Sequence, residues 1–237
     1  MKRVFGLAAC LLVILTSAVL AADPAPRPNP ATVAQQRVDQ MPAHNLYLDR
    51  ANRSDIDVLF LGDSNIQNWR EAGKSVWLER FRGMKAANFG IAGDRVENVL
   101  WRVENGIFIN CQPRLVVLLV GAGNAKVLTK EQVAEGMAGL VKRILDLSPQ
   151  SRILLLGLFP RGATSADPLR SQAAEINALL AKLDDGNKVF FLDIGPSFLQ
   201  PDGTISKEVM PDFAGLSTAG YKIWADAMQA KLTELLN

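Results

Sequence analysis

The stretch DVLFLGDS at residues 57–64 decides the fold class, because it joins a continuous apolar run to a glycine and two polar residues. A short apolar run that ends at glycine, here Gly62, is typical of a β-strand buried on both faces of a sheet. The run before Gly121 is the longest of this kind, with six apolar residues. Together with the run at 58–61, the candidate strands lie at residues 86–89, 115–120, 153–156 and 189–192.

Amphipathic helical patterns separate these runs. Apolar side chains recur on one helical face across residues 133–145, behind a capping box formed by Thr129 and Gln132. Further helices are expected at residues 169–183 and, behind Ser217 as N-cap, at 218–236. Strands that alternate with helices predict an α/β fold, a three-layer α/β/α sandwich with a doubly wound, parallel five-stranded sheet of the flavodoxin-like kind. Ligands of such sheets bind at the carboxyl ends of the strands.

The first residues predict an export signal. Lys2 and Arg3 precede an apolar run over residues 4–20, and the small residues near Ala21 offer a cleavage site. An uncleaved membrane anchor is the alternative, although the run is short for a span of about 20 apolar residues. We expect a protein of the periplasm or the extracellular space, divided into a signal peptide (1–21), a spacer rich in Pro, Ala and Gln (22–40) and one folded domain (41–237).

Composition and charge narrow the range of partners. The chain is 49% hydrophobic and 21% charged, as in an ordinary globular domain. The signal holds two of the 26 Lys and Arg residues and no acid, so 24 basic and 24 acidic residues remain. A net charge near zero without a basic patch gives no reason to expect a nucleic-acid partner. Cys10 lies in the signal, so Cys111 is the only cysteine left, no internal disulfide is expected, and the thiol is expected to be buried.

Ser64 stands where the first strand meets the next helix. A hydroxyl at a helix N-terminus lies where the helix dipole favours a developing negative charge, which suits a nucleophile. The simpler interpretation is that Asp63 and Ser64 only cap the helix, since both residue types are good N-caps. The residues of the other loops decide between the two.

Those loops carry a family resemblance. The stretches that carry it are residues 88–94, 99–102, 104–106, 116–121, 156–162, 202–206, 210–213, 216–217 and 220–224. In this order and spacing they resemble the SGNH (GDSL-like) hydrolases, and among these the catalytic subunits of platelet-activating-factor acetylhydrolase and their bacterial relatives. The resemblance covers roughly residues 41–235.

The resemblance implies an acyl-ester hydrolase that needs no metal or cofactor. Ser64 matches the nucleophile. Ser64 and Gly93 also match oxyanion-hole positions, Gly93 through its backbone N–H. Asp212 matches the carboxylate that orients a catalytic histidine. The implied partner is a small acylated substrate or ligand, a lipid or an acetylated glycan, and some relatives form homodimers.

Two positions depart from the family pattern. Gly123 stands where the family places an oxyanion-hole asparagine, and Asn124 is one residue beyond it, so only a local backbone slip would bring its amide to the oxyanion. Gly215 stands where the catalytic histidine is expected, three residues after Asp212. The only histidine of the sequence is His44, which precedes the whole strand–helix pattern. A structural role is expected for it, and a migrated general base is the alternative.

A serine hydroxyl is a poor nucleophile near neutral pH without a base that accepts its proton. The sequence therefore predicts a protein of hydrolase ancestry that is weak or inactive and binds its acylated ligand. An active esterase with a non-standard base and a dimeric scaffold protein are the alternatives.

Two further residue groups have plain interpretations. The carboxylates of Asp63, Asp94 and Asp212 could meet in one cleft, but carboxylates without histidine are weak evidence for a metal, and none is expected. Core packing is expected for the four tryptophans Trp69, Trp77, Trp101 and Trp224.

Overall fold

The computed structural model describes residues 28–53 and 55–237, and the expected signal peptide lies outside them. Its centre is a sheet of five strands in the order β2-β1-β3-β4-β5, with every neighbouring pair parallel. The strands are β1 Val58–Gly62, β2 Ala86–Gly90, β3 Leu115–Leu119, β4 Arg152–Leu156 and β5 Val189–Leu192. The predicted five-stranded parallel sheet is confirmed, and the boundaries differ from the apolar runs by at most one residue at either end.

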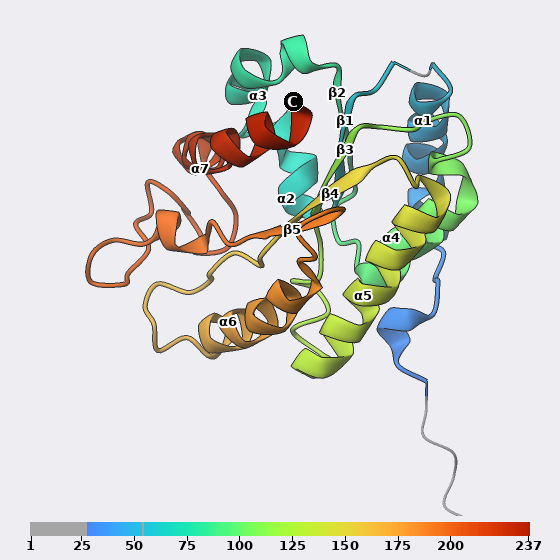
Figure 1. Ribbon diagram of the computed structural model, residues 1–237. Coiled ribbons are helices and arrows are strands. Elements are labelled where there is room, and N and C mark those ends of the chain that lie inside the picture. Colours follow the sequence, from blue (N-terminus) through green and yellow to red (C-terminus); the bar gives the residue numbers. More distant parts are fainter. Residues whose placement is uncertain (1–27, 54) are drawn as a thin grey trace, which may run out of the picture.

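Helices cover both faces of the sheet, as expected of a doubly wound fold. Figure 1 shows α1, α4 and α5 on one side and α3 and α7 on the other, and α6 packs against α5. The helices are α1 Met41–Ala51, α2 Ser64–Gln67, α3 Lys74–Arg80, α4 Val96–Arg102, α5 Lys130–Leu147, α6 Pro168–Leu180 and α7 Thr218–Leu236. No helix in the described part of the chain combines the length and apolar character that a membrane crossing requires.

Helix ends follow the capping residues of the sequence. The Thr129 hydroxyl accepts the N–H of Gln132 at 3.2 Å, and the Gln132 side chain accepts the N–H of Thr129 at 3.1 Å, so the predicted capping box is confirmed. Ser217 caps α7 by accepting the N–H of Gly220 at 3.2 Å. Helix α6 ends earlier than predicted, because its last residues tighten into a 3₁₀ turn at Ala181–Leu183.

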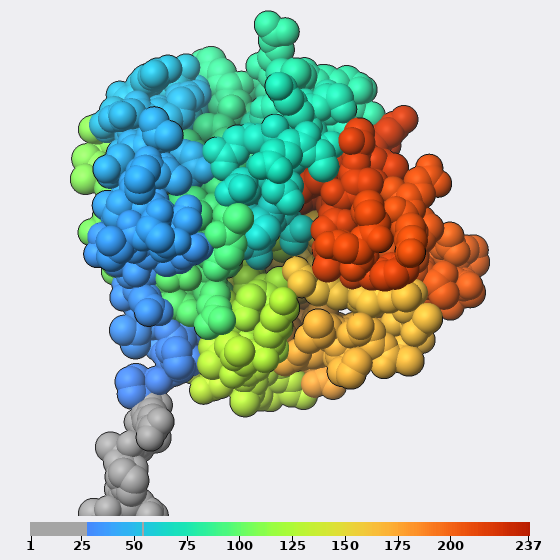
Figure 2. All heavy atoms as spheres, turned by 180° about the vertical axis from the view of Figure 1, so that it is seen from behind, coloured from blue at the N-terminus to red at the C-terminus, as the bar shows by residue number. Residues whose placement is uncertain are grey.

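The segment at 28–40 differs from the expected spacer, because it packs on the domain. Ala31 is fully buried against α5, where a Cβ on Gly136 would lie 2.5 Å from the Ala31 side chain. The Asn29 amide donates to the Gln132 carbonyl at 2.8 Å. Figure 2 shows the blue N-terminal segment against the yellow-green surface of α5. This close contact requires a small residue on both sides. Because residues 28–40 pack against α5 in this way, the folded domain begins before Met41.

An aromatic cluster fixes the region behind the first strand. Trp69 and Trp224 are fully buried, and their rings lie 4.9 Å apart between the sheet and α7. The Tyr221 hydroxyl donates to the Asn65 carbonyl at 2.7 Å, which ties α7 to the first turn of α2. Core packing is thus confirmed for these two tryptophans. Cys111 is 1% exposed, as predicted, and burial raises the pKa of its thiol to about 11.

Candidate functional site

A cavity of about 230 Å³ lies at the carboxyl ends of the strands, where the doubly wound topology predicts a site. The loops after β1, β2, β3 and β4 all contribute to its wall. The lining residues are Asp63, Ser64, Gly93, Asp94, Ala122, Gly123, Lys126 and Arg161. Four predicted site positions, Ser64, Gly93, Gly123 and Asp94, thus meet in one cavity.

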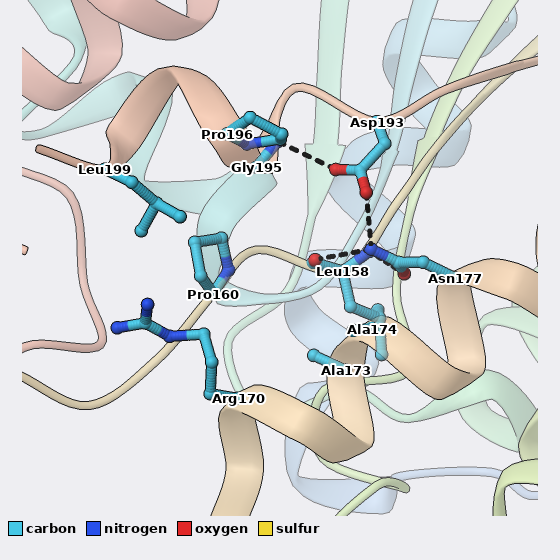
Figure 3. A pocket seen from close by; sticks show the side chains of 10 residues that line it. All are labelled: Leu158, Pro160, Arg170, Ala173, Ala174, Asn177, Asp193, Gly195, Pro196 and Leu199. Carbon is cyan, nitrogen blue, oxygen red and sulfur yellow. Dashed lines mark hydrogen bonds between the residues drawn. The ribbon is translucent and has the colours of Figure 1, made fainter. Parts of the chain in front are cut away.

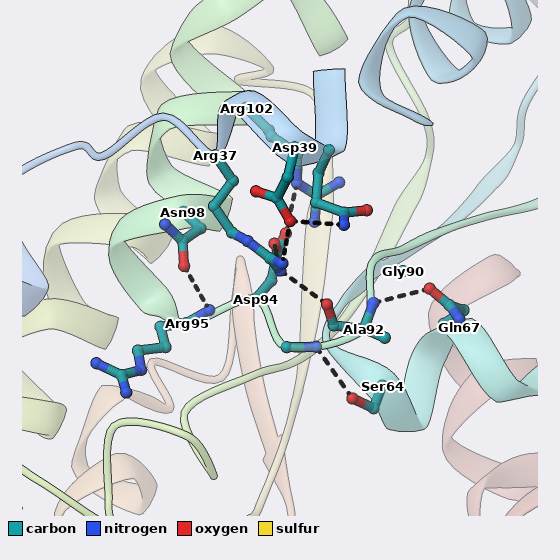
Figure 4. Close-up of polar contacts among 12 residues, drawn as sticks. Arg37, Asp39, Ser64, Gln67, Gly90, Ala92, Asp94, Arg95, Asn98 and Arg102 are labelled. Carbon is teal, nitrogen blue, oxygen red and sulfur yellow. Dashed lines mark hydrogen bonds and ion pairs between the residues drawn. The ribbon is translucent and has the colours of Figure 1, made fainter. Parts of the chain in front are cut away.

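Ser64 is the first residue of α2, and its hydroxyl is not the cap. The Asp63 carboxylate accepts the N–H of Asn65 at 3.0 Å and caps the helix alone. The Ser64 Oγ instead accepts the N–H of Gly93 at 3.2 Å (Figure 4). Among the described residues, no acceptor for the serine hydroxyl hydrogen is found. Capping therefore explains Asp63 but not the placement of Ser64.

The loop that presents Gly93 is held from both sides. The Arg37 guanidinium donates to the Ala92 carbonyl at 2.7 Å, and the Gln67 side chain accepts the Ala92 N–H at 2.7 Å (Figure 4). Gly93 itself has φ +78°, a conformation that side chains with a Cβ rarely adopt. The Gly93 N–H is therefore aimed at Ser64 by a fixed backbone and not by a mobile side chain.

A buried ion pair lies directly behind this loop. The Asp94 Oδ2 is 2.8 Å from the Arg102 Nε, and the Asp94 Oδ1 is 3.1 Å from Arg37. Arg102 also donates to the Phe89 carbonyl at 2.8 Å and to the Gly62 carbonyl at 3.2 Å. One guanidinium thus joins the ends of β1 and β2 to the Gly93 loop.

Neither Arg37 nor Arg102 was among the site residues predicted from the sequence. Arg102 falls inside one of the stretches that carry the family resemblance, which was the only signal for it. Arg37 falls in the expected spacer, and no local pattern links it to a loop more than 50 residues away.

Asp63 sits in the cavity wall with an unusual proton affinity. Its side chain is almost fully buried, and this desolvation raises the carboxyl pKa to about 6, against the lowering effect of the Asn65 N–H and of the charge of Arg161. Such a shift is typical of a functional cleft, although buried structural carboxylates show it too.

Asp212 lies outside the cavity wall, on an exposed loop before α7. Its Oδ1 accepts the N–H of Gly215 at 2.7 Å and that of Ala214 at 3.0 Å, and these bonds hold the pKa of the carboxyl below its usual value. A Cβ added to Gly215 would lie 3.6 Å from Asp212 Oδ1 and meet nothing closer. A side chain at position 215 would thus start beside the carboxylate, as a histidine oriented by Asp212 should.

The two residues at the asparagine position behave differently. Gly123 lines the cavity, and a Cβ there would lie 3.3 Å from Cγ of the exposed Arg95 side chain. Asn124 is fully buried: its oxygen accepts the Val96 N–H at 2.9 Å, and its amide donates to Glu97 at 2.7 Å. Asn124 therefore turns toward the start of α4, where both ends of its side chain are bonded, and does not line the cavity at Ser64.

His44 does not reach the serine. It is 2% exposed on α1, its Nε2 lies 3.1 Å from the Asn105 carbonyl oxygen, and its ring packs on Trp101 at 5.0 Å. Burial lowers the pKa of the imidazole. His44 lines a small separate cavity behind Asp94, so its surroundings fit the structural role and not the migrated base.

Of the three acids that could have met in one cleft, only two line the cavity. Asp63 and Asp94 line the cavity at Ser64, and Asp212 does not. Within residues 28–53 and 55–237, no group of three or more His, Cys, Asp or Glu side chains has a spacing that suits a metal ion.

An apolar region adjoins the cavity. Ala122 and Arg161 line both the cavity and a narrow apolar pocket. Leu158 and Ala173 line this pocket and also a second cavity of about 160 Å³. Figure 3 shows this second cavity between α6 and the turn at Pro196, with the Asn177 amide donating to Leu158 and to Asp193. Apolar surface is therefore available next to the polar groups at Ser64.

Known proteins share both the sequence and the fold. Residues 60–223 match the GDSL-like lipase/acylhydrolase family. Platelet-activating factor acetylhydrolase IB subunit alpha1 of Rattus norvegicus is 37% identical over 215 residues, which cover 90% of this chain and 91% of that protein. Subunit alpha2 of Rattus norvegicus is also 37% identical, with 90% of this chain and 92% of that protein covered. The solved structure of a GDSL-like lipase from Bacteroides thetaiotaomicron shares the fold, with a TM-score of 0.66 at 15% identity over 81% of this chain and 97% of that chain. The chain belongs to the GDSL-like lipase/acylhydrolase family, which confirms the resemblance found in its sequence.

Proposed function

We propose that this chain is an acylhydrolase descendant with little or no turnover, which binds an acyl ester in the cavity at Ser64. The observation that carries the proposal is the pairing of Ser64 with the Gly93 N–H at 3.2 Å in a sequence whose one histidine is held elsewhere. The binding half of an esterase site is present, and the proton-transfer half is not.

Proton transfer is the limiting step in this proposal. Attack on an ester carbonyl forms a bond from the serine oxygen to carbon while the hydroxyl proton moves to a base. Asp212 is a poor base, because hydrogen bonds already hold its pKa below the usual carboxyl value. Loss of a triad member in other serine hydrolases lowers kcat by about 10⁴ to 10⁶.

Binding of the ester requires no base and no proton transfer. In the proposed complex an ester carbonyl oxygen replaces the Ser64 Oγ as the acceptor of the Gly93 N–H, and the Ser64 hydroxyl can donate to the same oxygen. The apolar wall formed by Ala122 and Leu158 can cover the acyl chain. The fold and these hydrogen-bond donors do not determine which alcohol the ester contains.

The test is the double variant Gly123→Asn with Gly215→His. Neither glycine has a positive φ, and a Cβ at either position meets no backbone atom closer than 3.4 Å, so both side chains can be added without refolding a loop. We expect hydrolysis of p-nitrophenyl acetate by the double variant at least about 100-fold faster than by the parent, since both a base and an oxyanion donor are restored.

Two variants make the result specific. Ser64→Ala in the double-variant background should return the rate to that of the parent. Ser64→Ala in the parent should leave its hydrolysis rate unchanged. Parent turnover that Ser64→Ala abolishes would show a working base and refute the proposal in favour of an active esterase.

We also propose that the chain is exported, on the basis of the basic start and apolar run of residues 1–21. Cell fractionation of a bacterial host that expresses the full chain measures this directly, and recovery from the cytoplasm alone would contradict it.

A further inference from the structure

The cavity at Ser64 carries two cations that the proposed ester binding does not use. Lys126 lies on the loop after β3 and is exposed, and Arg161 lies on the loop after β4 and is half-buried. Within the described part of the chain, neither side chain has a hydrogen bond or ion pair. Their donors are therefore open to a ligand.

The carboxylates near the cavity do not form ion pairs with Lys126 or Arg161 among the described residues. Asp94 is bracketed by Arg37 and Arg102, so its carboxylate is already compensated. The charge of Arg161 acts on Asp63 and on Asp212, yet it forms an ion pair with neither among the described residues. The open cationic side of the cavity is thus the side of the β3 and β4 loops.

The hydrogen-bond donors for an ester lie in the wall of the same cavity, on the β1 and β2 loops. A ligand whose carbonyl is held by Ser64 and Gly93 has the remainder of its structure within reach of the two cations. A guanidinium presents a planar fork of N–H donors that matches a carboxylate, and an ammonium adds a point charge.

We propose that Lys126 and Arg161 make the site selective for acyl esters that also carry a carboxylate. This rests on the proposed function, because it assumes that the ester lies at Ser64. Both cations face water, so each contributes a modest and salt-dependent attraction, about fivefold in affinity at low ionic strength.

The test compares a ligand with a free carboxylate, 4-acetoxybenzoate, and its uncharged methyl ester, by calorimetric titration of the full chain. We expect the parent to bind the carboxylate at least about tenfold more tightly than the methyl ester, and this preference to shrink in 0.5 M salt. Lys126→Gln and Arg161→Gln should each weaken binding of the carboxylate about fivefold and leave the methyl ester unchanged. Lys142→Gln is the matched control, because Lys142 is an exposed lysine on α5 paired with Asp146.

The outcomes separate this inference from the proposed function. Equal binding of the two ligands would overturn the charge selectivity and leave ester binding intact. A preference that survives both glutamine variants would overturn its assignment to Lys126 and Arg161. Failure of both ligands to bind would refute ester binding itself, and with it this inference.

Discussion

Two carboxylates, Asp94 in the wall of the cavity at Ser64 and Asp212 outside it, are held in contrasting ways. Asp94 is 2% exposed and lies between two guanidiniums, which also bond to loop carbonyls. Asp212 is exposed, and one of its carboxylate oxygens, Oδ1, accepts two N–H groups of its own loop. Asp94 organises neighbouring elements, whereas Asp212 organises only the four residues around it.

Under the proposed function, in which the Gly93 loop is kept and the histidine is lost, this contrast gives a structural reason for that pattern. Removing Arg102 would leave a buried carboxylate short of a partner and free the ends of two strands, so the fold itself preserves this region. A histidine at position 215 would have stood over an exposed carboxylate, with nothing but Asp212 near its Cβ. Replacing it with glycine costs the structure little, because no other contact depends on it.

The largest effect that tests this comparison is expected from Arg102→Ala. The variant removes the Asp94 ion pair and the bonds to the Phe89 and Gly62 carbonyls. Breaking a buried pair from one side typically costs about 3–5 kcal/mol, and we expect a loss of that size in the free energy of unfolding, measured by urea denaturation at pH 7.

Arg95→Ala is the matched control, because Arg95 lies seven residues earlier, next to Asp94, and is exposed. It should change the free energy of unfolding by less than about 0.5 kcal/mol. A loss under about 1 kcal/mol for Arg102→Ala would mean that Arg37 alone compensates Asp94, and the proposed difference between the two carboxylates would not hold.

The two regions also differ in what the sequence could predict. Ser64, Gly93 and Asp212 follow from local stretches that resemble a family, and the strands follow from unbroken apolar runs. The bonds from Arg37 to the Gly93 loop link residues more than 50 positions apart, and no local periodicity encodes such a contact. The inward turn of Asn124 was equally hidden, because it depends on how α4 begins against the β3 loop.

An effect of intermediate size is expected at Asp63, smaller than that of Arg102→Ala and larger than that of a substitution at Asp212. Burial raises the pKa of this carboxyl to about 6 from 3.8, so the folded chain favours the protonated form. The contribution of the Asp63 carboxyl to the free energy of unfolding is therefore fully present below about pH 4. It is lost as the pH rises through about 6 and stays low at higher pH. Asp63→Asn keeps an amide oxygen for the Asn65 N–H and removes the buried charge.

We expect Asp63→Asn to raise the free energy of unfolding by about 2–3 kcal/mol at pH 8 and by nearly nothing at pH 4, as the pKa shift implies. Urea denaturation at both pH values measures the difference. An equal change at the two pH values would mean that Asp63 is not titrating in this window, and that packing or capping dominates the substitution.

The smallest effect is expected from Asp212→Asn, and its pH dependence should have the opposite sign. Hydrogen bonds lower the pKa of Asp212, so its contribution is present above the unfolded carboxyl pKa of about 4 and is lost as the pH falls below it. Because the group is exposed and an amide oxygen can still accept both N–H bonds, we expect a loss of less than about 0.5 kcal/mol at pH 7 and none at pH 3. The same denaturation series measures it. A loss of several kcal/mol would show that the loop before α7 depends on the charge of Asp212. Replacing a histidine at position 215 with glycine would then not be structurally neutral, and a contact on another element would have to compensate for the missing side chain.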